Sequence, residues 1–70
     1  MKSYDDGAFT IDVVSSTKFY QSYDRNGHPL IYSASEWECE FWSRAYLKAQ
    51  QEGWSHDTIT TYSSEVGGKL

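Results

Sequence analysis

The sequence predicts an α+β domain in which a three- to four-stranded antiparallel sheet packs on one amphipathic helix, in the order β-β-β-α-β. Three observations predict this fold. Short runs of β-forming residues occupy residues 9–33, an Asn26-Gly27 turn signal separates two of them, and a capped helical pattern begins at Ser35. A chain of 70 residues has room for a single domain, so we expect residues 1–70 to form one unit.

The lengths of the turns predict the register of the strands. Phe9, Ile11 and Val13 alternate with polar residues and predict a first strand, and residues 17–23 and 29–33 predict two more. A two-residue Asn26-Gly27 turn pairs Tyr23 with Leu30, and a three-residue connection at 14–16 pairs Ile11 with Phe19. Phe19, Tyr23, Leu30 and Tyr32 then join the first strand's apolar face. The open face receives Thr10, Asp12, Lys18, Tyr20, Ser22 and Ile31.

The helix has clear start and stop signals. Ser35-x-x-Glu38 is a capping box, and Gly53 is the expected stop, with Trp54 packing back on the last turn. At about 100° per residue, the apolar side chains form one broad arc that we expect to be core: Trp37, Phe41, Trp42, Ala45, Tyr46 and Ala49.

The ends of the chain carry weaker patterns. Residues 58–63 are rich in β-branched side chains and predict a short fourth strand after the helix. Residues 1–7 and 65–70 are expected to be frayed.

Catalytic, cofactor and metal sites are not expected, so the sequence argues against an enzyme. Cys39 lies between Glu38 and Glu40, which raise a thiol pKa and oppose thiolate chemistry. One cysteine and two distant histidines, His28 and His56, cannot form a closed four-ligand metal site. No apolar run reaches the roughly 20 residues of a membrane span, and the N-terminus lacks a secretory signal, so a cytoplasmic protein is expected.

Charge and aromatic content favour a protein-binding role. The net charge of −4 opposes a phosphate-gripping function, and 12 aromatic residues exceed what a small core needs. A protein partner with a basic surface is therefore expected, with the chain as a monomer or a homodimer. The alternative is a small DNA- or RNA-binding module that uses a three-stranded sheet. The candidate contact residues are acids outside the predicted core faces and one tyrosine of the open face: Asp5, Asp6, Asp12, Tyr20, Asp24, Glu36 and Glu40.

In size, acidity and hairpin-plus-helix layout, the chain resembles the small anti-defence proteins of bacteriophages and mobile elements, especially anti-CRISPR inhibitors. The resemblance is a profile of the whole chain without a diagnostic motif, so no functional residue is carried over from it. It implies a non-enzymatic inhibitor that occupies a basic nucleic-acid-binding surface of a bacterial defence complex, possessing no cofactor and acting in the bacterial cytoplasm.

Overall fold

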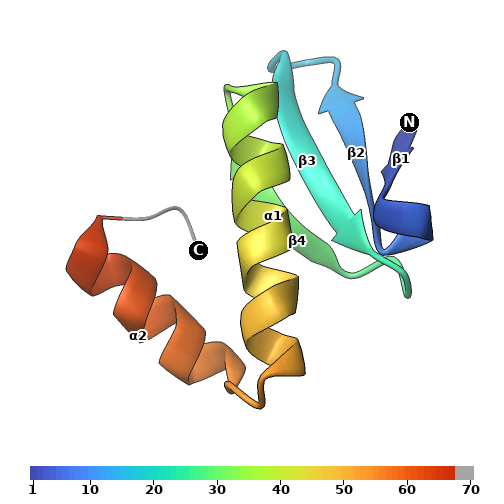
Figure 1. The fold of residues 1–70 in the computed structure, drawn as a ribbon. Coiled ribbons are helices and arrows are strands. Elements are labelled where there is room, and N and C mark those ends of the chain that lie inside the picture. Colours follow the sequence, from blue (N-terminus) through green and yellow to red (C-terminus); the bar gives the residue numbers. More distant parts are fainter. Residues whose placement is uncertain (68–70) are drawn as a thin grey trace.

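A computed structural model describes residues 1–67 and confirms the α+β class. The four strands form one antiparallel sheet in the order β1-β2-β3-β4. The first helix covers one face of this sheet, and the second helix lies on the side of the first helix away from the sheet (Figure 1). In chain order the elements are β1 (Lys2–Tyr4), the 3₁₀ turn η1 (Asp5–Gly7), β2 (Phe9–Val14), β3 (Phe19–Asp24), β4 (Pro29–Ser33), α1 (Glu36–Gln51) and α2 (His56–Val66).

The N-terminal segment supplies the fourth strand, so the expectation that residues 1–7 are frayed is wrong. β1 pairs with β2 in a register that places Tyr4 opposite Phe9 and Lys2 opposite Ile11. The Tyr4 and Phe9 rings stack with centroids 5.2 Å apart. Phe9 is buried, and its stacking contact with Tyr4 stabilises the pairing of β1 with β2.

The C-terminal segment forms a helix, and the predicted strand over residues 58–63 is wrong. The Ser55 side chain caps the first turn of α2 by accepting a hydrogen bond from the Thr58 amide. Ile59 and Ser63 are buried, and their i, i+4 spacing gives α2 one inward face. Residues 65–67 form the end of this helix and its cap, while residues 68–70 of the predicted frayed tail lie outside the described residues.

The connection between β2 and β3 changes the predicted register. It contains four residues, Ser15 to Lys18, and Lys18 has a φ of +61°. Val14 therefore opposes Phe19, and Ile11 opposes Ser22. This pairing is three residues away from the predicted one, and an odd shift turns every β3 side chain to the other face.

Most of the faces predicted for the second and third strands are consequently wrong, although Leu30 packs against the core as predicted. Phe19 and Tyr32 do share a face, where their rings stack at 4.9 Å, but it is the open face. Ser22 and Ile31 are buried against α1, and Tyr20 packs on the same core.

The β3–β4 turn also differs from the two-residue prediction. The Asp24 carbonyl accepts a hydrogen bond from the Gly27 amide, and the Asp24 amide donates to the His28 carbonyl. Of the turn residues, Gly27 alone has a positive φ, at +84°. A three-residue turn with a following bulge results, and Tyr23 opposes Pro29 rather than Leu30.

The ends of α1 are as predicted, but its rotation is not. Ser35 accepts from the Glu38 amide, and Gly53, with a φ of +93°, ends the helix while the Trp54 amide donates to the Ala49 carbonyl. The side chains that α1 buries are Cys39 and Ser43. Phe41 is 48% exposed, so its assignment to the core is wrong.

A chain of small polar groups explains why α1 lies so close to the sheet. The Ser43 and Ser22 hydroxyls are hydrogen-bonded at 2.6 Å, and the Ser22 oxygen also accepts from the Ile31 amide. The Cys39 thiol donates to the Ile31 carbonyl. These bonds satisfy polar groups that would otherwise be costly to bury, and only small side chains fit at this distance.

Candidate protein-binding surface

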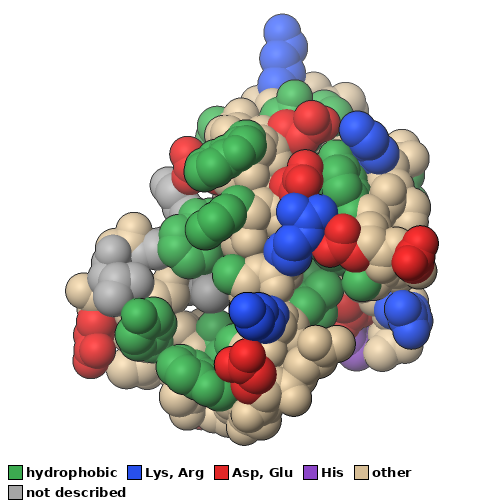
Figure 2. All heavy atoms as spheres, viewed as in Figure 1, with side chains coloured by type: hydrophobic (Ala, Val, Ile, Leu, Met, Phe, Trp, Pro, Cys, Tyr) green, Lys and Arg blue, Asp and Glu red, His purple; other side chains and the backbone are tan. Residues whose placement is uncertain are grey.

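A row of aromatic rings runs along α1 and continues onto α2. Trp37 stacks on Phe41 with centroids 5.4 Å apart, and Phe41 makes an edge-to-face contact with Trp42. Trp54 and Tyr62 form a second edge-to-face pair. Figure 2 shows hydrophobic side chains gathered over these two helices. We call these five residues the helical aromatic face.

The rotation of α1 explains why Trp37 and Phe41 lie outside, whereas Trp42 is partly buried against the core. At about 100° per residue, Trp37 and Phe41 lie about 120–160° around the helix from Cys39 and Ser43. Cys39 and Ser43 face the sheet, so the Trp37 and Phe41 rings face solvent. Trp37 is 69% exposed, which makes it the most exposed aromatic residue of the row.

An apolar hollow joins the two parts of the row. It lies between α1 and α2 and has a volume of about 140 Å³. That volume suits one apolar side chain, since a cavity of about 150 Å³ accepts a benzene ring. It is well below the roughly 300–1,000 Å³ of typical small-molecule sites. The lining residues are Trp42, Ala45, Ala49, Trp54, Ile59, Tyr62 and Ser63.

The negative charge of the chain is concentrated on the helices. Residues 36–66 contain six carboxylates and two cations, a formal charge of −4, whereas residues 1–35 contain four carboxylates and three cations. Residues 36–66 therefore carry an excess of negative charge equal to the net charge of the whole chain. Its carboxylates are Glu36, Glu38, Glu40, Glu52, Asp57 and Glu65.

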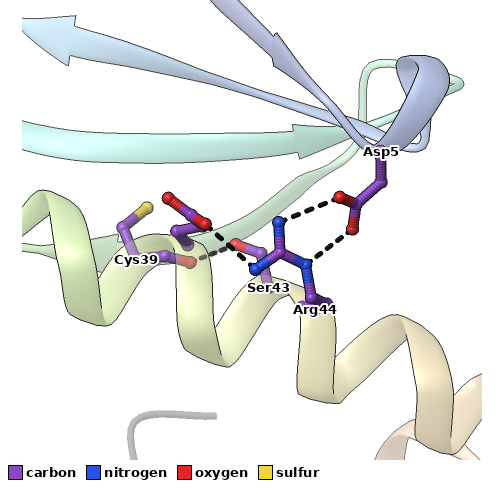
Figure 3. Close-up of polar contacts among 5 residues, drawn as sticks. Asp5, Cys39, Ser43 and Arg44 are labelled. Carbon is purple, nitrogen blue, oxygen red and sulfur yellow. Dashed lines mark hydrogen bonds and ion pairs between the residues drawn. The ribbon is translucent and has the colours of Figure 1, made fainter.

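One cation of α1 is held within the molecule. The Arg44 guanidinium donates two hydrogen bonds to the Asp5 carboxylate, at 2.7 and 2.9 Å, and a third to Glu40 at 2.9 Å. Figure 3 shows Arg44 of α1 reaching Asp5 in η1. The hydrogen bonds from Arg44 lower the pKa of the Asp5 carboxyl, while desolvation opposes the shift. This cation is thus already paired, and it fixes η1 against α1.

The structure does not gather the predicted site residues into one surface. Asp5 and Glu40 meet through Arg44, but Asp12 lies on the sheet, 3.8 Å from the Met1 amino group. Asp24 belongs to the β3–β4 turn. The remaining two acids are both exposed, one in η1 and one in the first turn of α1: Asp6 and Glu36.

Tyr20 does not have the position predicted for it. It faces α1 and packs against the core cluster, because the β2–β3 register places it on the helix side of the sheet. Its predicted location as a ring on the open face is wrong. The exposed rings of the open face are Phe19 and Tyr32, and the other exposed rings lie on the helices and their connection.

Reactive side chains are either buried or scattered. Cys39 is fully buried, and desolvation raises the pKa of its thiol. The Tyr46 hydroxyl and His56 Nδ1 lie 3.0 Å apart on the surface. Within residues 1–67 no group of three or more His, Cys, Asp or Glu side chains is placed to hold a metal ion. None of the described helices has the length and apolar character needed to cross a membrane.

A family model matches residues 2–70 of the chain. The protein belongs to DUF7468, a family of unknown function. No curated protein and no solved structure matches the chain. In this DUF7468 member, the features that bear on function are the exposed rings and the excess of carboxylates on the helices.

The sequence prediction missed the exposure of Trp37, Phe41 and Tyr62. One signal was available for the first two. Cys39 and Ser43 are small, are four residues apart and lie opposite the rings, which is the pattern of a helix that approaches a sheet closely. The exposure of Tyr62 was missed because its segment was predicted to be a strand rather than a helix.

Proposed function

We propose that this protein is a non-enzymatic binding domain that docks on a basic surface of another protein through the helical aromatic face. The observation that supports the proposal is two groups of exposed rings, joined by an apolar hollow, on the half of the molecule that carries the negative charge. Aromatic residues are enriched at the centres of protein interfaces, and Trp and Tyr, together with Arg, are enriched among their hot spots.

The size of the row is consistent with an interface centre. Trp37, Phe41, Trp54 and Tyr62 are exposed by 69, 48, 38 and 54%. With about 150–250 Å² per ring, they present on the order of 300–500 Å² of aromatic surface. A standard interface buries about 800 Å² per partner, so the surrounding polar side chains would complete it.

The finer proposal concerns the partner. Its basic surface is one that holds nucleic acid in a bacterial defence complex, and docking there in the bacterial cytoplasm displaces the nucleic acid. Two facts support this choice. A surface that neutralises phosphates must be basic, and six carboxylates on residues 36–66 supply the complementary charge.

The open face of the sheet supports the alternative of a DNA- or RNA-binding module. Its stacked Phe19 and Tyr32 rings are 36 and 49% exposed, and exposed rings on a sheet can stack on bases. Charge opposes this alternative, because residues 1–35 contain one more carboxylate than cations. We therefore keep it as the second candidate.

A capture experiment separates the two candidates. The wild-type protein, Trp37→Ala/Phe41→Ala and Tyr32→Ala are immobilised and exposed to a bacterial lysate and, separately, to random-sequence DNA and RNA. Tyr32→Ala is the matched control, because it removes a ring of similar exposure to Phe41 from the opposite face. Circular dichroism checks that each variant is folded.

The proposal predicts one or more proteins that the wild type and Tyr32→Ala retain and the double variant loses. Binding of the purified partner should weaken as salt is raised, and nucleic acid should compete with it. Equal retention by all three proteins would contradict docking through the helices. Salt-sensitive capture of random nucleic acid that Tyr32→Ala abolishes would favour the alternative.

A further inference from the structure

The helical aromatic face also indicates what the partner presents to it, an inference that rests on the proposed function. We infer that the partner contributes an arginine side chain that stacks on Trp37 beside Glu36 and Glu40. The same partner segment places an apolar side chain in the hollow between α1 and α2. Ring geometry, local charge and the spacing along α1 support this inference.

Trp37 presents an open ring at the end of the row. Its contact with Phe41 is parallel, with an angle of 12° between the ring planes, so Phe41 covers one side of the indole. With 69% of the residue exposed, the other side is available to a ligand. Indole is the best side-chain partner for a cation above the ring plane.

The charges around Trp37 select a cation. No Lys or Arg occurs between Asn26 and Ser43, whereas Glu36, Glu38 and Glu40 all fall in this segment. The positive end of the helix dipole amounts to only about half a charge. Glu40 is already paired with Arg44, but Arg44 is shared with Asp5, so these groups together remain negative. An anionic ligand or a second copy of this acidic chain is therefore disfavoured at this position.

Arginine suits this position better than lysine. A planar guanidinium can stack flat on the ring while the N–H groups at its edge donate two parallel hydrogen bonds to a carboxylate, a geometry that an ammonium does not have. The molecule already contains one such arrangement. Arg44 lies 5.7 Å from the Phe9 ring centroid while it donates to Asp5 and Glu40.

The spacing of the two contacts defines the partner segment. Trp37 precedes Ala45 and Ala49 of the hollow by 8 and 12 residues, which correspond to about 12–18 Å along a helix. The arginine and the apolar side chain of the partner should be separated by this distance. Two to three turns of a basic amphipathic helix provide it.

Synthetic peptides test this inference without a known partner. The probe is an alanine-rich helical peptide with one leucine and, two and three turns away, two arginines. Matched peptides carry lysine or glutamine at the arginine positions. Binding to the ¹⁵N-labelled protein is followed by nuclear magnetic resonance, in which the indole N–H signals of Trp37, Trp42 and Trp54 report the contact separately.

The expected result is binding of the arginine peptide with shifts at the Trp37 indole. Trp37→Leu keeps an apolar side chain and the net charge but removes the indole, and it should weaken binding about three- to tenfold. Tyr32→Leu, a change on the opposite face, should leave binding unchanged. The lysine peptide should bind more weakly than the arginine peptide, and the glutamine peptide most weakly.

Other outcomes overturn the inference. They are equal binding of the glutamine peptide, no effect of Trp37→Leu, shifts away from the helices, or no binding by any peptide. The proposed function is judged separately by the capture experiment. A captured partner that Trp37→Ala/Phe41→Ala loses but Trp37→Leu retains in full would leave the docking surface in place and remove the arginine contact.

Discussion

The Asp24 carboxylate holds the β3–β4 turn together. Its Oδ1 atom accepts hydrogen bonds from the Asn26 and His28 amides, both at 2.9 Å. The hydrogen bond from the His28 amide is the main reason that the pKa of Asp24 lies below its ordinary value of 3.8, while desolvation opposes the shift. A carboxyl with a lowered pKa stabilises the folded state at neutral pH and loses this effect as pH falls through its folded pKa.

We expect Asp24→Ala to lower the free energy of unfolding at pH 7 by about 0.5–2 kcal/mol, the loss typical of a side chain that caps backbone amides. Urea denaturation at pH 7 and in a series below pH 4 measures the effect. The difference between variant and wild type should shrink at acidic pH, because the protonated Asp24 is a weaker acceptor. A difference that stays constant at low pH would contradict a role for the charge.

At the scale of elements, α1 and α2 begin in the same way but depend on different packing. Each starts with a serine that accepts a hydrogen bond three residues on, Ser35 from Glu38 and Ser55 from Thr58. α1 covers the sheet, whereas α2 packs beside α1 (Figure 1). Loss of the Ser35 cap should therefore destabilise the whole domain, whereas loss of the Ser55 cap should destabilise α2 alone.

Ser35→Ala is expected to lower the global free energy of unfolding by about 0.5–2 kcal/mol. Ser55→Ala, its matched control, should mainly speed amide hydrogen exchange within α2 and change the global midpoint less. Urea denaturation and residue-resolved hydrogen exchange measure the two effects. Equal effects on global stability would mean that α2 unfolds together with the rest of the domain.

The elements with local signals were the ones that the sequence predicted well. The start of α1 at Ser35 and its end at Gly53 depend on contacts within a few residues, and both are confirmed. The β2–β3 connection has no such signal. The residue with a positive φ there is Lys18, whereas an Asn or Gly at that position would have indicated the turn. Without that turn, the register and the two faces of β3 could not be inferred.

The helical aromatic face was missed in the sequence prediction for a related reason. Hydrophobicity alone assigns Trp37 and Phe41 to the core, since they belong to the largest side chains of α1. Close approach of the helix to the sheet requires small groups instead, and Ser22 and Ser43 provide them at 2.6 Å between their hydroxyl oxygens. This contact joins residues 21 positions apart, so periodicity within one helix cannot reveal it.

At the scale of the whole molecule, the two layers differ in charge. The helices carry the carboxylate excess together with the helical aromatic face, and the sheet presents a smaller aromatic pair on its open side. Opposite charge on a partner would speed the encounter with the helical side and would orient the domain before the rings make contact. The arrangement thus assigns steering and anchoring to the same side of the protein.

Stability of the whole domain depends on a small core, in which Phe9 is fully buried. We expect Phe9→Ala to lower the free energy of unfolding by about 3–5 kcal/mol. This loss is comparable to the total that a single core of this size supplies, about 3–5 kcal/mol, so the variant should be largely unfolded. Phe41→Ala, on the exposed side of α1, should cost only about 1 kcal/mol.

Urea denaturation of the two variants, followed by circular dichroism, measures this contrast. The two substitutions remove the same side chain, so the difference between them reports position rather than chemistry. A folded Phe9→Ala together with an unfolded Phe41→Ala would mean that α1 is rotated to bury its rings against the sheet. The helical aromatic face would then not exist as a surface, whereas the predicted order keeps Phe41 available to a partner because the fold does not depend on it.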